Sequence, residues 1–156
     1  MRHLLFFPAI AMMFLVVACG PVKGYPGPAR PSGQLANIQP NPFWSGIGVV
    51  VTGVDGLDVQ AEMSLDVLAG RRTLRLQLQP YSRTERGQAS GAELQSQAMY
   101  DMEWQTTVDW TIELSPGMDY ALAGSWNETV YEVQLQDART RTVIATRPVT
   151  AVRRSL

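Results

Sequence analysis

Strict alternation of apolar and polar residues is the feature that most constrains the fold of this 156-residue chain. In the block 71–79, three leucines alternate with one arginine and two glutamines. In an extended strand, alternation with a period of two puts every apolar side chain on the same face. The block therefore predicts a half-buried antiparallel strand, and we expect Pro80 to end it because proline cannot donate to a ladder.

The same alternation recurs in blocks that turn residues separate. A β-branched run over 47–54 ends in Asp55-Gly56, a dipeptide that supplies the positive φ angles of a tight hairpin. Further alternating or apolar blocks lie at 65–68, 108–114, 118–122, 131–135 and 143–145. Short strands between turn signals are typical of an all-β fold, and we expect an antiparallel β-sandwich of about seven strands. The polar segment 81–97 predicts a long loop, and residues 92–100 are an alternative short helix with a weak apolar face.

The N-terminus has the three parts of a bacterial export signal. A charged start, Met1-Arg2-His3, precedes the apolar run 4–17, and small residues follow at Ala18 and Gly20. The run is shorter than the roughly 18 to 20 residues of a spanning helix and contains Pro8, which disfavours a permanent transmembrane anchor. We therefore predict a signal peptide over residues 1–18.

The segment Val16-Val17-Ala18-Cys19 resembles the lipobox of bacterial lipoproteins. That resemblance implies cleavage before Cys19, diacylglycerol on its sulfur and an acylated amine, which together anchor a protein stably to a membrane. Cys19 is the only cysteine, so it cannot form a disulfide within the chain. An ordinary signal with an unmodified cysteine is the alternative. Gly20 in place of an acidic residue favours the outer membrane by resemblance to the sorting rule of Gram-negative lipoproteins.

Proline and glycine divide the remaining chain into two expected parts. Residues 19–42 carry the acylated cysteine and are rich in both residue types, which predicts a tether. Within it, Leu35-Ala36-Asn37-Ile38 is apolar enough for a first edge strand. We expect residues 43–156 to form the single β domain.

Charge and residue inventory exclude several classes of function. The chain has 13 lysine and arginine residues against 14 aspartates and glutamates, so it offers no basic field for nucleic acid. The only histidine, His3, leaves with the signal, and the only lysine, Lys23, lies in the predicted tether. Without these bases we predict no enzyme, no cofactor and no metal site. Asp101 with Glu103 as a catalytic pair, and Asp55, Asp58, Glu62 and Asp66 as a calcium site, are better explained as solvated or turn residues.

Aromatic residues are the remaining candidates for recognition. Phe43, Trp44 and Trp126 lie near predicted turns, and we expect them to be possible partner-binding residues. Trp110 and Tyr120 are in phase with apolar neighbours and are expected in the core. Arginines 71, 72 and 75, with arginines 139 and 141, could form a basic patch for acidic lipid or polymer, but a solvated face with ion pairs is the interpretation we favour.

A loose family resemblance covers most of the mature chain. The segment Tyr25-Pro26-Gly27-Pro28-Ala29-Arg30-Pro31, with Ala36 and Ile38 after it, resembles the region behind the lipidated cysteine in a group of small bacterial lipoproteins. The turns of that group also have counterparts here: a Val-Asp-Gly turn at Val54-Asp55-Gly56, a hairpin at Leu68-Ala69-Gly70 and a second hairpin over 115–120. A late strand that ends near Asp137 completes the similarity. The similarity implies a sandwich like the PEGA and transthyretin-like domains. The chain departs from that group in two places. Gln34-Leu35 stands where its members usually have an acidic residue, and residues 41–46 look like an insertion relative to them.

These expectations combine into one functional hypothesis. We predict a lipid-anchored lipoprotein of the bacterial envelope, on the periplasmic face of the outer membrane in a Gram-negative host. Its expected role is noncatalytic binding of another envelope protein through loops or a strand edge. A module that binds peptidoglycan or another glycan is the first alternative. An accessory lipoprotein of a secretion complex is the second, by architecture alone.

Overall fold

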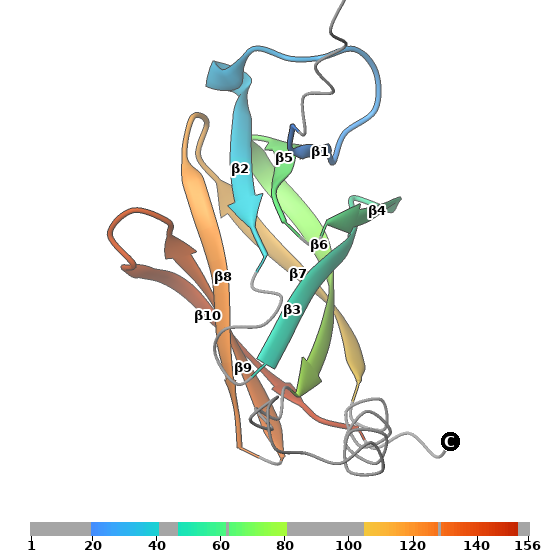
Figure 1. Cartoon of the computed structure of the whole chain (residues 1–156), viewed down its shortest axis with the longest axis vertical. Helices are drawn as coiled ribbons and strands as arrows, with labels where there is room; N and C mark the ends of the chain where they lie inside the picture. Colours follow the sequence, from blue (N-terminus) through green and yellow to red (C-terminus); the bar gives the residue numbers. More distant parts are fainter. Residues whose placement is uncertain (1–19, 41–46, 62, 81–104, 128, 153–156) are drawn as a thin grey trace, which may run out of the picture.

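The computed structural model describes residues 20–40, 47–61, 63–80, 105–127 and 129–152. These residues form ten strands and one short 3-10 turn (Figure 1). The elements are β1 (Val22–Lys23), η1 (Ser32–Gln34), β2 (Leu35–Gln39), β3 (Ile47–Val54), β4 (Leu57–Ala61), β5 (Leu65–Leu68), β6 (Gly70–Pro80), β7 (Thr106–Leu114), β8 (Asp119–Trp126), β9 (Val130–Asp137) and β10 (Val143–Thr150).

The strands form two sheets. The six-stranded sheet has the order β1-β5-β2-β8-β9-β10, and the four-stranded sheet has the order β4-β3-β6-β7. All pairs of the smaller sheet are antiparallel, as expected. The larger sheet is mixed, because β1 runs parallel to β5 and β2 runs parallel to β8. The prediction of an all-β sandwich is confirmed, whereas the expectation of purely antiparallel pairing is corrected at these two pairs.

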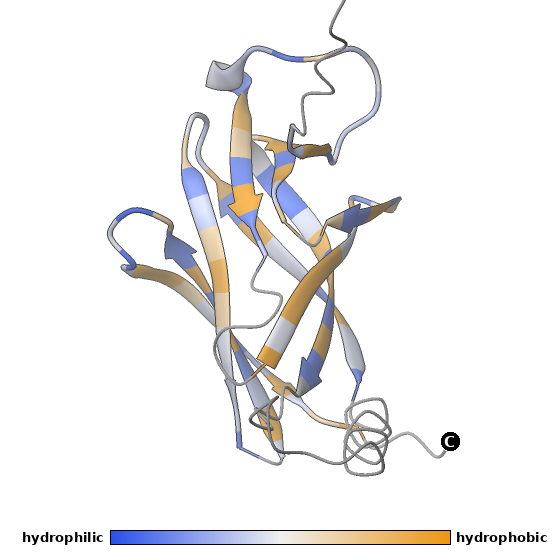
Figure 2. Ribbon diagram, viewed as in Figure 1, coloured by the Kyte–Doolittle hydropathy of each residue, from blue (hydrophilic) through white to orange (hydrophobic). Residues whose placement is uncertain are grey.

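The core lies between the sheets and follows the alternation in the sequence. Figure 2 shows hydrophobic and hydrophilic residues in turn along the strands. Leu74, Leu76 and Leu78 of β6 are fully buried, while the residues between them reach the surface. Trp110 and Tyr120 are buried as predicted, and no buried side-chain nitrogen or oxygen of the described residues lacks a hydrogen-bond partner.

The Asp55-Gly56 turn joins β3 to β4 as the sequence predicts. Asp55 and Gly56 have φ angles of 49° and 84°, and Val54 pairs with Leu57, so the turn has two residues with positive φ. The Asp55 carboxylate accepts hydrogen bonds from the Thr73 N–H at 2.8 Å and from Arg72 at 3.0 Å. The aspartate therefore shapes the turn and also ties it to β6.

Two turns that resemble hairpins in the sequence instead carry the chain from one sheet to the other. Gly70, with φ of 99°, joins β5 in the larger sheet to β6 in the smaller one. Gly117, with φ of 73°, lies between β7 in the smaller sheet and β8 in the larger one. Both crossings are tied to the start of β2: Ala69 N–H donates to the Gln34 carbonyl, and Gly117 N–H donates to the Leu35 carbonyl.

The segment expected to be a tether is part of the sandwich from residue 20 to residue 40. β2 lies between β5 and β8, well inside the larger sheet, and Ala36 and Ile38 have no exposed surface. Tyr25 is also buried, and its hydroxyl accepts a hydrogen bond from the Arg30 N–H. The expectation of a tether is thus corrected for residues 20–40, because short apolar runs between prolines supply strands and core side chains. The expected boundary at 42/43 lies outside the described residues. The expected edge strand at 35–38 is an inner strand.

Several other predictions fall outside the described residues. These include the signal peptide, Cys19, the loop at 81–97 and its alternative helix at 92–100. Among the residues that are described, there is no helix of the length and hydropathy needed to cross a membrane.

Candidate functional site

The aromatic residues proposed for partner binding do not come together in the described structure. Phe43 and Trp44 lie outside the described residues. Trp126, at the end of β8, is half-buried and packs against the core. Its ring stacks on Tyr131, with centroids 4.4 Å apart and an interplanar angle of 28°. Trp126 thus closes one end of the core.

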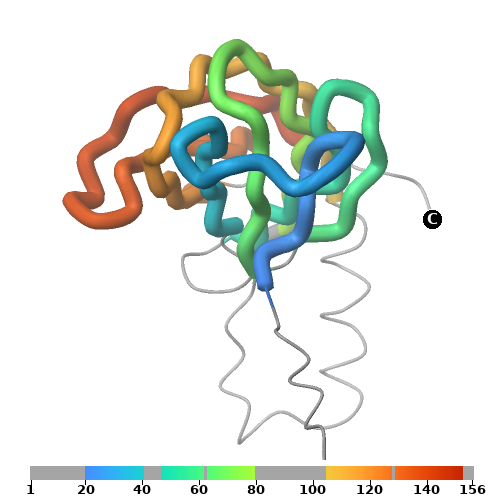
Figure 3. Tube along the Cα trace, turned by 90° about the horizontal axis from the view of Figure 1, so that it is seen from above, coloured from blue at the N-terminus to red at the C-terminus, as the bar shows by residue number. Residues whose placement is uncertain are grey.

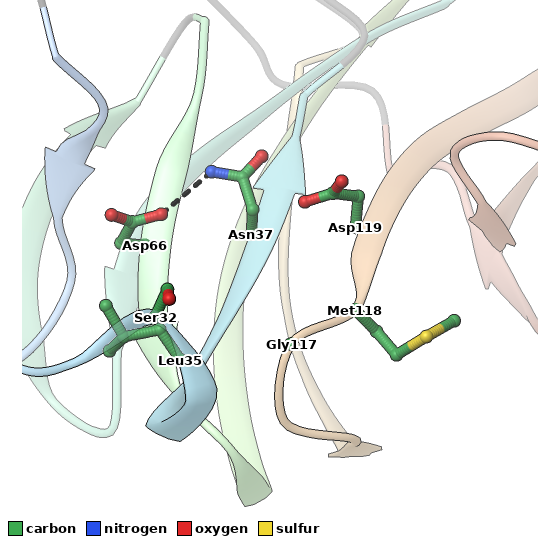
Figure 4. A pocket seen from close by; sticks show the side chains of 7 residues that line it. All are labelled: Ser32, Leu35, Asn37, Asp66, Gly117, Met118 and Asp119. Atoms are coloured by element: carbon green, nitrogen blue, oxygen red, sulfur yellow. Dashed lines mark hydrogen bonds between the residues drawn. The ribbon is translucent and has the colours of Figure 1, made fainter.

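The outer face of the six-stranded sheet carries an open pocket of about 230 Å³, lined by both polar and apolar side chains. Asp66 on β5, Asn37 on β2 and Asp119 on β8 stand in register across three neighbouring strands. Figure 4 shows Asn37 between the two carboxylates. Ser32, Leu35 and Met118 also line the pocket. No sequence pattern groups these residues, because they come from segments far apart in the chain.

Hydrogen bonds hold the amide of Asn37 in place. Its Nδ2 donates to Asp66 Oδ1 and to Ser64 Oγ, both at 2.8 Å. The Ser64 hydroxyl in turn donates to Asn37 Oδ1 at 3.2 Å. Asn37 therefore cross-links β2 to β5 and orients the Asp66 carboxylate toward the middle of the pocket.

The pocket presents hydrogen-bonding groups from three neighbouring strands. Asp66 and Asp119 lie two strands apart, which corresponds to about 10 Å between Cα atoms at the usual strand spacing. Asn37 occupies the position between them, and its amide is hydrogen-bonded to Asp66. Within the described part of the chain, no three histidine, cysteine or acidic side chains come together as metal ligands.

The described acidic residues that were considered as calcium ligands lie in three different places and have other partners. Asp55 pairs with Arg72 at 3.0 Å, and Asp58 pairs with Arg75 at 3.4 Å. Arg75 also pairs with Asp109 on β7 at 3.4 Å. The predicted solvated face with ion pairs is thus confirmed for Arg72 and Arg75. Asp66 belongs to the pocket, and Glu62 lies outside the described residues.

Asn127 has a local structural role in a turn. Asn127 Oδ1 accepts hydrogen bonds from the N–H groups of Thr129 and Val130, and from the Thr129 hydroxyl. An asparagine that bonds the backbone two or three residues ahead is a common turn device. Asn127 and Thr129 therefore occupy their positions to form the turn between β8 and β9.

The β9–β10 hairpin adjoins the pocket and exposes two large apolar side chains. Val143 and Ile144, at the start of β10, are 46% and 49% exposed. Val143 pairs with Gln136 and Ala145 pairs with Leu135, so a bulge leaves Ile144 without a partner of its own on β9. The hairpin meets the pocket at Asp119, whose carbonyl accepts a hydrogen bond from the Ala138 N–H. We call Val143, Ile144, Gln134 and Gln136 the hairpin surface.

The polar half of the hairpin surface is an ordered row of side chains. On β9, Gln136 Nε2 donates to Gln134 Oε1, and Gln134 Nε2 donates to Glu132 Oε1, each at 2.9 Å. On the neighbouring strand β8, the buried Ala121 and the half-buried Ala123 pair with Gln136 and Gln134. Because hydrogen bonds already tether these amides to each other, they lose little side-chain entropy on binding.

Strand β10 forms one edge of the larger sheet among the described residues. Ala151 N–H donates to the Thr129 carbonyl, so the antiparallel pattern directs the main-chain groups of Arg147 and Val149 toward β9. The groups of Thr146, Pro148 and Thr150 then point away from the sheet, and Pro148 has no N–H to offer. Proline at such an edge position discourages the addition of another strand.

Asp137 organises the turn of the hairpin. Its Oδ1 accepts hydrogen bonds from the N–H groups of Thr140, at 2.7 Å, and Arg139, at 2.9 Å. Backbone and side-chain hydrogen bonds from Thr140, followed by bonding and attraction from Arg139, hold the pKa of the Asp137 carboxyl below its usual value.

We expect acid to weaken this turn. Because the folded pKa of Asp137 is lowered, its contribution to stability is complete above the ordinary carboxyl pKa and disappears as pH falls through the lowered folded value. The amide chemical shifts of Arg139 and Thr140 should follow this titration in an NMR experiment. Asp137→Asn retains an acceptor oxygen and should remove the titration. An identical titration in Asp137→Asn would contradict the assignment to Asp137.

Comparison with family models, with curated proteins and with solved structures found no match to this chain. The pocket and the hairpin surface are therefore interpreted from their own geometry. One sequence signal could have indicated the hairpin surface: the apolar run Val143-Ile144-Ala145 interrupts the period of two.

Proposed function

We propose that this protein is a lipid-anchored, noncatalytic module of the bacterial envelope that binds another envelope protein through the outer face of the six-stranded sheet. The observation that carries the proposal is the pair of large apolar side chains, Val143 and Ile144, held about half-exposed by a bulge. Exposed apolar side chains within a polar surround are typical of protein-binding surfaces.

The surroundings of these side chains fit the same role. Arg139 and Arg141 are exposed at the hairpin turn, and arginine is enriched in protein interfaces. The pocket beside the hairpin offers carboxylate, amide and hydroxyl groups for a polar rim. Pro148 disfavours main-chain pairing along β10, so we expect the partner to contact side chains rather than add a strand.

The glycan alternative gains less support. A sugar-binding surface needs an exposed aromatic face near hydrogen-bonding groups. Trp126 is half-buried against Tyr131, on the core side of the sheet, whereas the carboxylates Asp66 and Asp119 belong to the outer face. The described residues therefore favour a protein partner.

Replacement of the two apolar residues tests the proposal. In intact cells, Val143→Ser combined with Ile144→Ser should lower the crosslinking yield to a recurrent protein partner several-fold, because the partner loses its apolar contact. Leu57→Ser is the matched control, since Leu57 is also an exposed apolar residue but lies on the other sheet. The yield is measured by quantitative mass spectrometry, after equal melting temperatures are verified. Full yield from the double variant, or equal loss in the control, would contradict the proposal.

A further inference from the structure

The chain between the predicted lipid anchor and the sandwich is very short. Only Gly20 and Pro21 separate Cys19 from β1, which begins at Val22. Three residues of fully extended chain span about 10 Å at most. If acyl chains on Cys19 enter a bilayer, β1 must lie within about that distance of the lipid surface.

The chain cannot gain length by releasing β1 without disturbing the core. Val22 N–H donates to the Ser64 carbonyl at 2.7 Å, and Gly24 N–H donates to the Asp66 carbonyl at 2.8 Å. Gly24 lies so close to the sheet that an added Cβ would be 2.9 Å from Val67 Cγ1. Tyr25 follows with only 5% of its surface exposed. The segment is thus fastened to the domain directly behind the anchor.

Two exposed apolar side chains lie at the β1 edge of the sheet. Val22 is 38% exposed, and Met63, next to the residue that bonds Val22, is 75% exposed. The exposed Lys23 follows Val22 in β1, and its ammonium donates to the Gly27 carbonyl and lies 5.2 Å from the centre of the Tyr25 ring; this places a positive charge near the same edge, which suits anionic lipid headgroups. Val22, Lys23 and Met63 are called the β1 edge surface below.

We infer that the β1 edge surface rests on the bilayer to which Cys19 is anchored, with Met63 and Val22 in the interfacial layer. The inference rests on the acylation of Cys19 that the proposed function includes. β1 and β10 are the opposite edges of the six-stranded sheet, five strand spacings or about 24 Å apart. Figures 1 and 3 show the β9–β10 turn well away from β1. This orientation leaves the hairpin surface accessible to a partner.

Site-specific labelling tests the orientation. Because the Cys19 sulfur is blocked by lipid, Met63→Cys provides a single labelling site, and Ile144→Cys is the matched control at the opposite edge. Each full-length lipidated variant is labelled with a fluorophore in vesicles of phosphatidylethanolamine and phosphatidylglycerol. We expect a nitroxide on the lipid headgroup to quench the label at 63 several-fold more than the label at 144. Aqueous iodide should show the reverse order.

Two further measurements test whether the short connection holds the edge at the membrane and whether Cys19 is acylated at all. A flexible glycine-serine insertion between Gly20 and Pro21 should raise iodide quenching at position 63 toward the value at 144, because the short connection holds the edge at the membrane. Equal quenching at the two positions in acylated protein would overturn the inference and leave the proposed partner binding intact. An unmodified Cys19 in mass spectrometry would overturn the anchor itself, and with it the inference.

Discussion

Deletion of residues 20–39 from the mature chain is expected to abolish cooperative unfolding. The deletion removes β1 and β2, and β2 is the strand that joins β5 to β8 in the larger sheet. It also removes Tyr25, Ala36 and Ile38 from the core. Loss of a single large core side chain costs about 2–5 kcal/mol, and the whole stability of a domain is about 5–15 kcal/mol. Circular dichroism during heating or urea titration measures the effect.

A point variant tests the same segment more gently. Ile38 is fully buried in β2, and its neighbour Gln39 is exposed on the same strand. Ile38→Ala should lower the free energy of unfolding by about 2–5 kcal/mol. Gln39→Ala is the control, and it should change the free energy of unfolding by no more than about 0.5 kcal/mol. A chain without residues 20–39 that still melts cooperatively would show that this segment is a tether after all.

Gly124→Val is expected to destabilise the sandwich by about 3 kcal/mol, because it forces atoms into a filled space. Gly124 lies on β8 and faces β3 across the core. A Cβ at this position would collide with the Ile47 side chain and would lie 2.7 Å from the Glu132 carbonyl oxygen. Main-chain atoms of the paired strand β9 cannot move aside without breaking the ladder, so relaxation is limited.

The next residue on the same strand provides the control. Ser125 is exposed, and its side chain points to the other face of the sheet. Ser125→Val adds the same residue to β8 and should change the free energy of unfolding by about 0.5 kcal/mol or less. Urea denaturation of both variants gives the comparison. Equal stability of Gly124→Val and the natural chain would mean that β3 does not pack on β8 as described.

The candidate sites differ in how far the sequence could reveal them. The break in alternation at Val143-Ile144 is visible in the sequence, although its exposure is not. The pocket of Asn37, Asp66 and Asp119 has no sequence signal, because its residues are far apart along the chain and meet only through the pairing of β5, β2 and β8. Trp126 shows the reverse case. Its place near a turn suggested exposure, but the adjacent ring of Tyr131 half-buries it.

The sequence by itself determined the all-β class, the inward face of most strands and the hairpin at Asp55-Gly56. These features depend on neighbours along the chain, since alternation selects a face and positive φ selects a turn. Only the tertiary structure decided which strands pair. It placed the proline-flanked β2 between β5 and β8, and it made Gly70 and Gly117 crossings between sheets. An apolar face can pack against many partners, so the choice of partner rests on long-range packing that no local pattern contains.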